Sequence, residues 1–244
     1  MMKAKEEFQF SNSVILIPIF LVLLIWTIFW VEIRFGFDFT TWGIYPQTIK
    51  GLRGVLFSPF IHSGISHLYH NTIPLFVLTA ALFYFYKPIA WKILIYGVLL
   101  SGFITWAIGR PSYHIGASGL IYVLVSFTFF KGIFAKHYRL IALSLIVVFL
   151  YGSMIWYVLP IKEGVSWEGH SAGLITGMLF AIIFKKEIAR PKKYVWEEEG
   201  FIEEDDPFLK HFDEKGNFIE FKESKVEEEL NIKYTFKSNK EEEL

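Results

Sequence analysis

The feature that most constrains this chain is a series of long apolar runs that contain few charges. A helix needs about 20 mostly apolar residues, within a range of roughly 17–25, to cross the hydrocarbon core of a bilayer. In lipid the backbone must satisfy its own hydrogen bonds, so such runs predict helices. The sequence therefore predicts an all-α membrane protein with six transmembrane helices. The predicted spans are 14–31, 67–86, 93–109, 117–130, 140–160 and 169–185.

Composition supports a membrane protein with a polar tail. Apolar residues make up 53% of the chain and charged residues 20%, whereas soluble domains contain about 45–50% and about 25%. Residues 1–193 carry a net charge of +10 and residues 194–244 carry −10. The positive charges interrupt apolar runs and form no basic stripe, so nucleic acid is not a predicted partner. The absence of cysteine excludes disulfides and thiolate metal sites.

The predicted organisation has three parts. Residues 1–13 form a cytoplasmic N-terminus, 14–188 the helical membrane domain and 189–244 a charged cytoplasmic tail. The first outer loop, 32–66, is long and rich in aromatic residues, which favours partial packing into the membrane interface. In the tail, disorder and a small β structure with a turn near 215–217 are both compatible with the sequence.

The distribution of Lys and Arg predicts the orientation. With a cytoplasmic N-terminus, the inner side receives 12 of these residues and the outer side 5. Cytoplasmic loops carry the excess of positive charge, so both termini are predicted to be cytoplasmic. The first apolar run is too long for the core of a signal peptide and no A-x-A-like cleavage site follows it. We interpret it as a retained first span.

Polar residues within apolar spans are costly, and three clusters of them indicate a site. The clusters begin the second, fourth and sixth predicted spans. Even-numbered spans run from the outside inward in this topology, so all three clusters lie at outer helix ends and can share one region. They are His67, His70 and Asn71; the Gly-Ala-Ser-Gly run at 116–119; and the Gly-His-Ser run at 169–171.

Each cluster alone also has a purely structural interpretation, because small residues let helices pack closely and polar pairs join helices. Together the three clusters predict a catalytic site in which a serine hydroxyl acts as the nucleophile. Ser118 is a candidate nucleophile and His170 a candidate base on another helix. The Asn71 amide, the His67 imidazole and the Ser118 backbone N–H are candidate donors to an oxyanion.

Neighbouring residues fit the same hypothesis. Gly116 and Gly119 leave space beside Ser118, while Gly173 and Gly177 allow the sixth span to approach the fourth. Tyr122 shares a helix face with Ser118 and can pack on the base.

Acidic residues are nearly absent from the spans. No Asp occurs between Asp38 and Asp205, which excludes a pair of facing Asp residues and a Ser-His-Asp triad. Glu168 lies two residues before His170 and points to another side of the helix. A Ser-His dyad is predicted, with the imidazole oriented by a group other than a carboxylate.

Several motifs, in order and spacing, resemble the rhomboid intramembrane serine proteases of the six-helix form. They are Trp-Gly-Ile-Tyr-Pro at 42–46, Phe-Ile-His-Ser-Gly at 60–64, His67-x-x-x-Asn71, His-Ile-Gly-Ala-Ser-Gly at 114–119, and Gly-His-Ser-Ala-Gly at 169–173 followed by Gly177. The similar region covers residues 38–188. Two positions depart from the family pattern: Gln47 stands where Arg is frequent, and Gly169 where Ala often precedes the histidine.

The resemblance implies that Ser118 is the nucleophile, that His170 is the general base and acid, and that Tyr122 stacks on the catalytic ring. It also implies that His67 and Asn71 line the oxyanion hole. Similar proteins cleave membrane-anchored substrates, with single-span proteins as typical partners within the lipid bilayer, and use no metal, cofactor or ATP. Six spans without an added helix are typical of family members in a prokaryotic plasma membrane, where the site opens to the outside.

Two other functions are compatible with parts of the pattern. A rhomboid-like protein can bind or escort membrane helices without cutting them, although such relatives typically lack the nucleophile or the base. A metal-binding or transport protein could use the outer histidines, but no carboxylate accompanies them within the membrane. Those histidines are His62, His67, His70 and His114.

Overall fold

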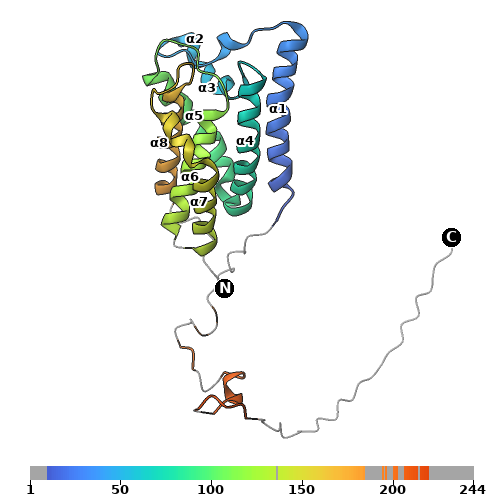
Figure 1. Cartoon of the computed structure of the whole chain (residues 1–244), viewed down its shortest axis with the longest axis vertical. Coiled ribbons are helices and arrows are strands. Elements are labelled where there is room, and N and C mark those ends of the chain that lie inside the picture. Colours follow the sequence, from blue (N-terminus) through green and yellow to red (C-terminus); the bar gives the residue numbers. More distant parts are fainter. Residues whose placement is uncertain are drawn as a thin grey trace, which may run out of the picture. The chain divides into compact units, whose positions relative to one another are not determined.

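The structure is a computed structural model of the 244-residue chain. It describes residues 10–135, 137–184, 194, 196, 200–202, 206–213 and 215–219. The predicted N-terminal segment as far as residue 9, residue 185 and most of the predicted tail therefore lie outside the described residues. Residues up to 191 and residues from 192 onward form two separate units. The described part of the first unit is a bundle of helices without a named strand (Figure 1).

Among the residues that the structure describes, five helical segments are long and apolar enough to cross a membrane. The chain is therefore an all-α, multi-pass membrane protein. A further helix, α8, has 17 residues, which is at the lower end of the range for a span. The count of six spans stays a prediction. The five are α1 (Ser13–Phe35), α4 (Ile65–Phe85), Lys87–Ile108 containing α5 (Ala90–Ile108), α6 (Ser118–Ala135), and Tyr138–Val158, in which α7 (Tyr138–Tyr151) continues as the 3-10 segment η4 (Gly152–Val158).

The helix α6 is the central element of the bundle. It is the most buried of the five candidate spans and contacts α4, α5, α7 and α8. The helix α8 (Trp167–Ile183) packs mainly on α6 and α5, while α1 packs on α4 at the other side of the bundle (Figure 1). Leu124 and Phe127 of α6 are fully buried. The residues at the start of α6 and α8 are therefore held by the core of the bundle.

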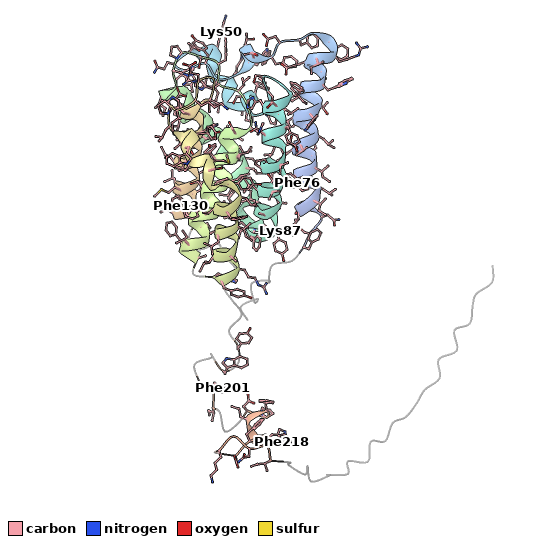
Figure 2. All side chains as sticks on the ribbon, viewed as in Figure 1. Lys50, Phe76, Lys87, Phe130, Phe201 and Phe218 are labelled. Carbon is pink, nitrogen blue, oxygen red and sulfur yellow. The ribbon has the colours of Figure 1, made fainter. Side chains whose placement is uncertain are left out.

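The segment between α1 and α4 folds into short helices at one end of the bundle. Its elements are η1 (Thr40–Trp42), α2 (Ile49–Leu52), α3 (Gly54–Phe57) and η2 (Ser58–Phe60). Its backbone is bonded to the segment between α5 and α6: Ile44 and His114 exchange two hydrogen bonds of 3.0 and 2.8 Å, and the Gly116 N–H donates to Ser58 O at 2.8 Å. Lys50 in this segment and Lys87 after α4 lie at opposite ends of the bundle (Figure 2). The segment between α1 and α4 thus covers the end at which α6 begins.

The second unit contains a small turn structure. Phe212 and Phe218 form an antiparallel bridge, and the Asp213 carboxylate accepts hydrogen bonds from the backbone N–H groups of Lys215 and Asn217. Gly216 has a φ of +78°, which a glycine adopts without strain. The bridge and these hydrogen bonds close a turn at residues 213–217, and the two alternatives for the rest of the tail stay predictions.

Candidate active site

Ser118 is the first residue of α6, and the loop before it is fixed by a glycine. Gly116 has a φ of +109°, a backbone conformation that side chains rarely adopt. Its N–H donates to Ser58 O, which ties the loop to the segment between α1 and α4. At the first residue of a helix the backbone N–H has no partner within the helix. The Ser118 N–H can therefore donate to an external group at the positive end of the helix dipole.

His170 lies in the first turn of α8 and meets Ser118, although the two are 52 residues apart. Its Nε2 is 3.0 Å from the Ser118 Oγ, and its Nδ1 is 2.9 Å from the carbonyl oxygen of Tyr157 in η4. A carbonyl can only accept, so Nδ1 carries the proton and Nε2 is free to accept the hydroxyl proton. A backbone carbonyl thus holds the ring in the tautomer that a general base requires.

Tyr122 packs on the same imidazole. The two rings are stacked, with centroids 4.3 Å apart and an interplanar angle of 17°. The Tyr122 hydroxyl donates to the carbonyl of Met154 in η4 at 2.6 Å, which fixes the phenol ring. One face of His170 is therefore covered by an aromatic ring, and η4 supplies a carbonyl to each of the two side chains.

Close contact between α6 and α8 depends on two glycines of α8. A Cβ at Gly173 would lie 2.3 Å from the carbonyl oxygen of Gly119, and a Cβ at Gly177 would lie 2.3 Å from that of Val123. Both distances are far below van der Waals contact with backbone atoms that cannot yield. The G-x-x-x-G spacing thus brings the two helices together at the level of Ser118. A Cβ at Gly119 would meet nothing closer than 3.6 Å.

The residues expected to form an oxyanion hole lie on α4. A Cβ at Gly116 would lie 2.6 Å from the His67 Nε2, so this ring lies against the loop that precedes Ser118. The His67 Nδ1 is 3.2 Å from the Ser63 hydroxyl. Asn71 is buried, and its amide donates to the His67 carbonyl at 2.8 Å. That bond uses one of the two N–H groups of the amide.

The four histidines of the metal-site interpretation do not all meet at one point. His70 bonds through Nδ1 to the Ser66 carbonyl of its own helix at 2.6 Å, and the His114 Nδ1 lies 2.6 Å from the Ser166 hydroxyl. The His62 ring packs on the His67 ring with centroids 5.0 Å apart. Within the described ranges, no group of three or more His, Asp or Glu side chains could hold a metal ion. The geometry therefore does not support the metal-site interpretation.

The buried ring of His62 makes stability depend on pH. Burial lowers the pKa of His62 to about 4, and the His67 ring acts in the same direction. The Nε2 has no hydrogen-bond partner among the described residues, so protonation would bury an unpaired N–H. The unfolded chain, with a pKa of about 6.5 at this residue, binds the proton more readily. The free energy of unfolding is therefore highest above about pH 6.5, and it falls as the pH decreases toward 4.

We expect the unfolding free energy to be about 2 kcal/mol lower at pH 5 than at pH 7 because of this residue. Thermal unfolding in a mild detergent at both pH values measures the difference. His62→Gln, which is neutral at both, is expected to lose that part of the pH dependence. An equal pH dependence in the variant and the wild type would contradict the assignment to His62.

A small cavity lies behind Ser118. Its volume is about 30 Å³, enough for about one water molecule. Hydroxyl groups from four elements line it together with the His114 ring; they belong to Ser58, Ser101, Thr105, Ser118 and Ser166. Apolar side chains, among them Val55, Val98 and Leu120, complete the lining. Sequence reasoning missed Ser101 and Thr105, although two hydroxyl residues four apart in an apolar span were a visible signal.

Sequence reasoning also missed the side chains that join the loop before α6 to the start of α8. The Glu168 carboxylate is 1% exposed and pairs with Arg110, with 3.6 Å between the Arg110 Nη1 and the Glu168 Oε1. Ser166 caps α8 by accepting from the Gly169 N–H at 3.3 Å. The sequence signal for this connection was the Glu168 carboxylate at the start of the last apolar run.

Comparison with known proteins identifies the family of the chain. A family model for the rhomboid domain matches residues 50–187. An uncharacterized protein of Mycobacterium tuberculosis is 36% identical over 157 residues, which cover 58% of this chain and 62% of the relative. An uncharacterized protein of Mycobacterium leprae is 34% identical over 148 residues, covering 54% and 56%. The matched part thus spans about three fifths of the length of these relatives. With more than half of its residues inside the family model, the chain belongs to the rhomboid family.

Proposed function

We propose that this chain is an intramembrane serine endopeptidase that cleaves membrane-anchored proteins with a Ser118–His170 dyad. The contact that carries the proposal is the 3.0 Å approach of the His170 Nε2 to the Ser118 Oγ, with Nδ1 bonded to the Tyr157 carbonyl. A hydroxyl is a weak nucleophile until a positioned base accepts its proton. Membership of the rhomboid family supports the same class of reaction.

In the acylation step, the Ser118 Oγ attacks the scissile carbonyl carbon while the His170 Nε2 takes the hydroxyl proton. The imidazolium that forms keeps its Nδ1–H bond to Tyr157 and faces the Tyr122 ring, and both interactions stabilise the positive charge. His170 then donates the proton to the leaving amine. The acyl group stays on Ser118 as an ester.

The negative oxygen of the tetrahedral intermediate requires hydrogen-bond donors. The Ser118 backbone N–H is one of them. With the Ser63 hydroxyl donating to Nδ1, the His67 Nε2 carries a proton and becomes a second donor. Asn71 is the third, through the amide N–H that its bond to the His67 carbonyl does not use.

Hydrolysis of the acyl-enzyme needs a water close to His170. The cavity that Ser118 lines has room for about one water molecule beside the acylated oxygen. His170 takes a proton from the water, the hydroxide attacks the ester carbon, and the proton returns to the Ser118 oxygen. These steps use only side chains and backbone groups of this chain, so the proposal includes no metal, cofactor or ATP.

The substrates are single-span or other membrane proteins whose helix unwinds readily near the cleavage site. An intact helix hides its carbonyls in hydrogen bonds, so helix-breaking or small residues favour access to Ser118. We extend the proposal to topology: α8 is the sixth span, both termini are cytoplasmic, and the site opens to the outside of a prokaryotic plasma membrane. Lys50 and Lys87 lie at opposite ends of the bundle (Figure 2), and the larger number of Lys and Arg residues expected on the side of Lys87 supports a cytoplasmic position of that end.

Labelling with a serine-reactive fluorophosphonate separates a protease from an escort protein. The wild type in detergent or liposomes is expected to take up one label per chain, because Ser118 is activated by His170. Ser118→Ala should take up none. Ser126→Ala is the matched control: its hydroxyl lies on the same helix and donates to the Leu174 carbonyl at 2.6 Å, so labelling should remain. Folded wild-type protein that is not labelled would favour the escort function.

A further inference from the structure

Two chain segments determine whether Ser118 and His170 meet, and side chains that take no part in the proposed proton transfers connect them. One is the loop 109–117, which leads into Ser118 at the start of α6. The other is the start of α8, which carries His170. Four residues join the two segments and are called the clamp below: Arg110, His114, Ser166 and Glu168.

The first half of the clamp is a chain of hydrogen bonds in which the donor and the acceptor of each bond are determined. The Gly169 N–H donates to the Ser166 Oγ at 3.3 Å, so the hydroxyl hydrogen of Ser166 can point elsewhere. It donates to the His114 Nδ1 at 2.6 Å, and the His114 Nε2 then donates to the Arg110 carbonyl at 3.2 Å. Each donor has an acceptor when His114 is neutral. Burial, the largest influence, lowers the pKa of His114 and favours that neutral state.

The second half of the clamp is an ion pair with a buried carboxylate. The Glu168 Oε1 accepts the backbone N–H of Arg110 at 3.2 Å and lies 3.6 Å from the guanidinium. The guanidinium also donates to the Val165 carbonyl at 2.8 Å. A carboxylate that is 1% exposed is costly unless it is paired. Glu168 therefore fixes the first turn of α8, two residues before His170, to the loop before Ser118.

Two glycines leave space for the clamp. A Cβ at Gly169 would lie 2.9 Å from the Ser166 Oγ, and a Cβ at Gly109 would lie 3.0 Å from the His114 Nε2. Gly169 is the position at which similar sequences often have Ala, and a methyl group there would press on the hydroxyl that bonds His114. The same histidine also exchanges backbone hydrogen bonds with Ile44, so it joins the segment between α1 and α4 to both parts of the site.

We propose that Arg110, His114, Ser166 and Glu168 are positioning residues that set the Ser118–His170 geometry by clamping the loop 109–117 to the first turn of α8. The inference rests on the proposed protease function. The residues contact neither the reacting hydroxyl nor the catalytic imidazole in the hydrogen bonds described above. They act on the reaction through the placement of two helix starts, and a small misplacement of reacting groups is enough to slow a reaction about a hundredfold.

The test compares Ser166→Ala with Ser166→Thr in liposomes that contain a single-span substrate. Ser166→Ala removes both hydrogen bonds of the hydroxyl and is expected to lower kcat by about ten- to a hundredfold, with KM within about twofold of the wild type. Ser166→Thr keeps a hydroxyl and should restore kcat. The rate of fluorophosphonate labelling should fall and recover in parallel, because it depends on activation of the same hydroxyl.

Thr48→Ala is the matched control for the loss of a helix cap. Thr48 caps α2 by accepting from the Gly51 N–H at 3.1 Å and has no bond to α8. It should leave kcat close to that of the wild type. Glu168→Gln tests the other half of the clamp without opening a cavity. If Ser166→Ala does not fold, Glu168→Gln is measured in its place. Its kcat is also expected to fall while KM stays unchanged.

Wild-type kcat in folded Ser166→Ala and Glu168→Gln would overturn the clamp and leave the protease function intact. A fall of kcat in Thr48→Ala as large as that in Ser166→Ala would also overturn it, because the effect would then reflect the lost cap. Wild-type protein that neither cleaves nor takes up the fluorophosphonate would instead overturn the protease function, and the clamp with it.

Discussion

Ser118→Ala is expected to reduce cleavage of a single-span substrate in liposomes below detection. In the proposed mechanism the substitution removes the atom that forms the acyl-enzyme, while the helix α6 and the core around it stay unchanged. In a soluble serine protease, loss of the nucleophile lowers kcat by about a millionfold. Substrate and product are separated on a gel after incubation with equal amounts of folded wild type and variant. Ser126→Ala, on the same helix, should cleave as the wild type does.

The same assay tests whether Ser118 and His170 act as one unit. His170→Ala should lose nearly as much activity as Ser118→Ala, and the double variant should lose no more than either single variant. Such non-additivity is expected because the base has no function without the hydroxyl that it activates. Full activity of Ser118→Ala, or independent losses that multiply in the double variant, would contradict the dyad.

Gly173→Ala is expected to impair both stability and cleavage. The new methyl group would lie 2.3 Å from the Gly119 carbonyl oxygen and 2.7 Å from the Tyr122 Cβ, so α8 must move away from α6. Overpacking of this kind costs about 1–3 kcal/mol. The displacement also carries His170 away from Ser118, and we expect a loss of kcat of about a hundredfold.

The measurements are the thermal unfolding midpoint in detergent and the rate of fluorophosphonate labelling. Gly152→Ala is the matched control, because a Cβ there would meet only the Val148 side chain at 3.5 Å, an ordinary contact. It should keep the midpoint and the labelling rate of the wild type. If Gly173→Ala retained both, close approach of α6 and α8 would not be required for the site.

Much of the fold could be predicted because the signals for it are local. A run of apolar residues long enough for the bilayer predicts a helix wherever it occurs, and each predicted span from the first to the fifth overlaps a helix of suitable length. The α8 helix was harder to place. Its 17 residues are near the minimum for a transmembrane helix, so length alone does not decide whether α8 crosses the membrane.

The composition of the candidate site was also visible in the sequence. The absence of Asp from the spans left a dyad as the simplest arrangement for Ser118 and His170. The carbonyl of Tyr157 could not be predicted, because every residue has a carbonyl and only the path of η4 directs this one at the imidazole. The role of Glu168 was likewise hidden, since its partner Arg110 is 58 residues away in the chain.

The sequence by itself determined the membrane class of this protein, its helical content and the residue types available for chemistry, because bilayer length and helix periodicity act over some twenty neighbouring residues. Only the tertiary structure decided which groups meet. The approach of Ser118 and His170 depends on the positive φ angle at Gly116, on the absence of a side chain at Gly173, and on the ion pair of the buried Glu168 carboxylate with Arg110. The last two are contacts between segments distant in the chain, whose geometry is set by packing and by the pairing of buried polar groups.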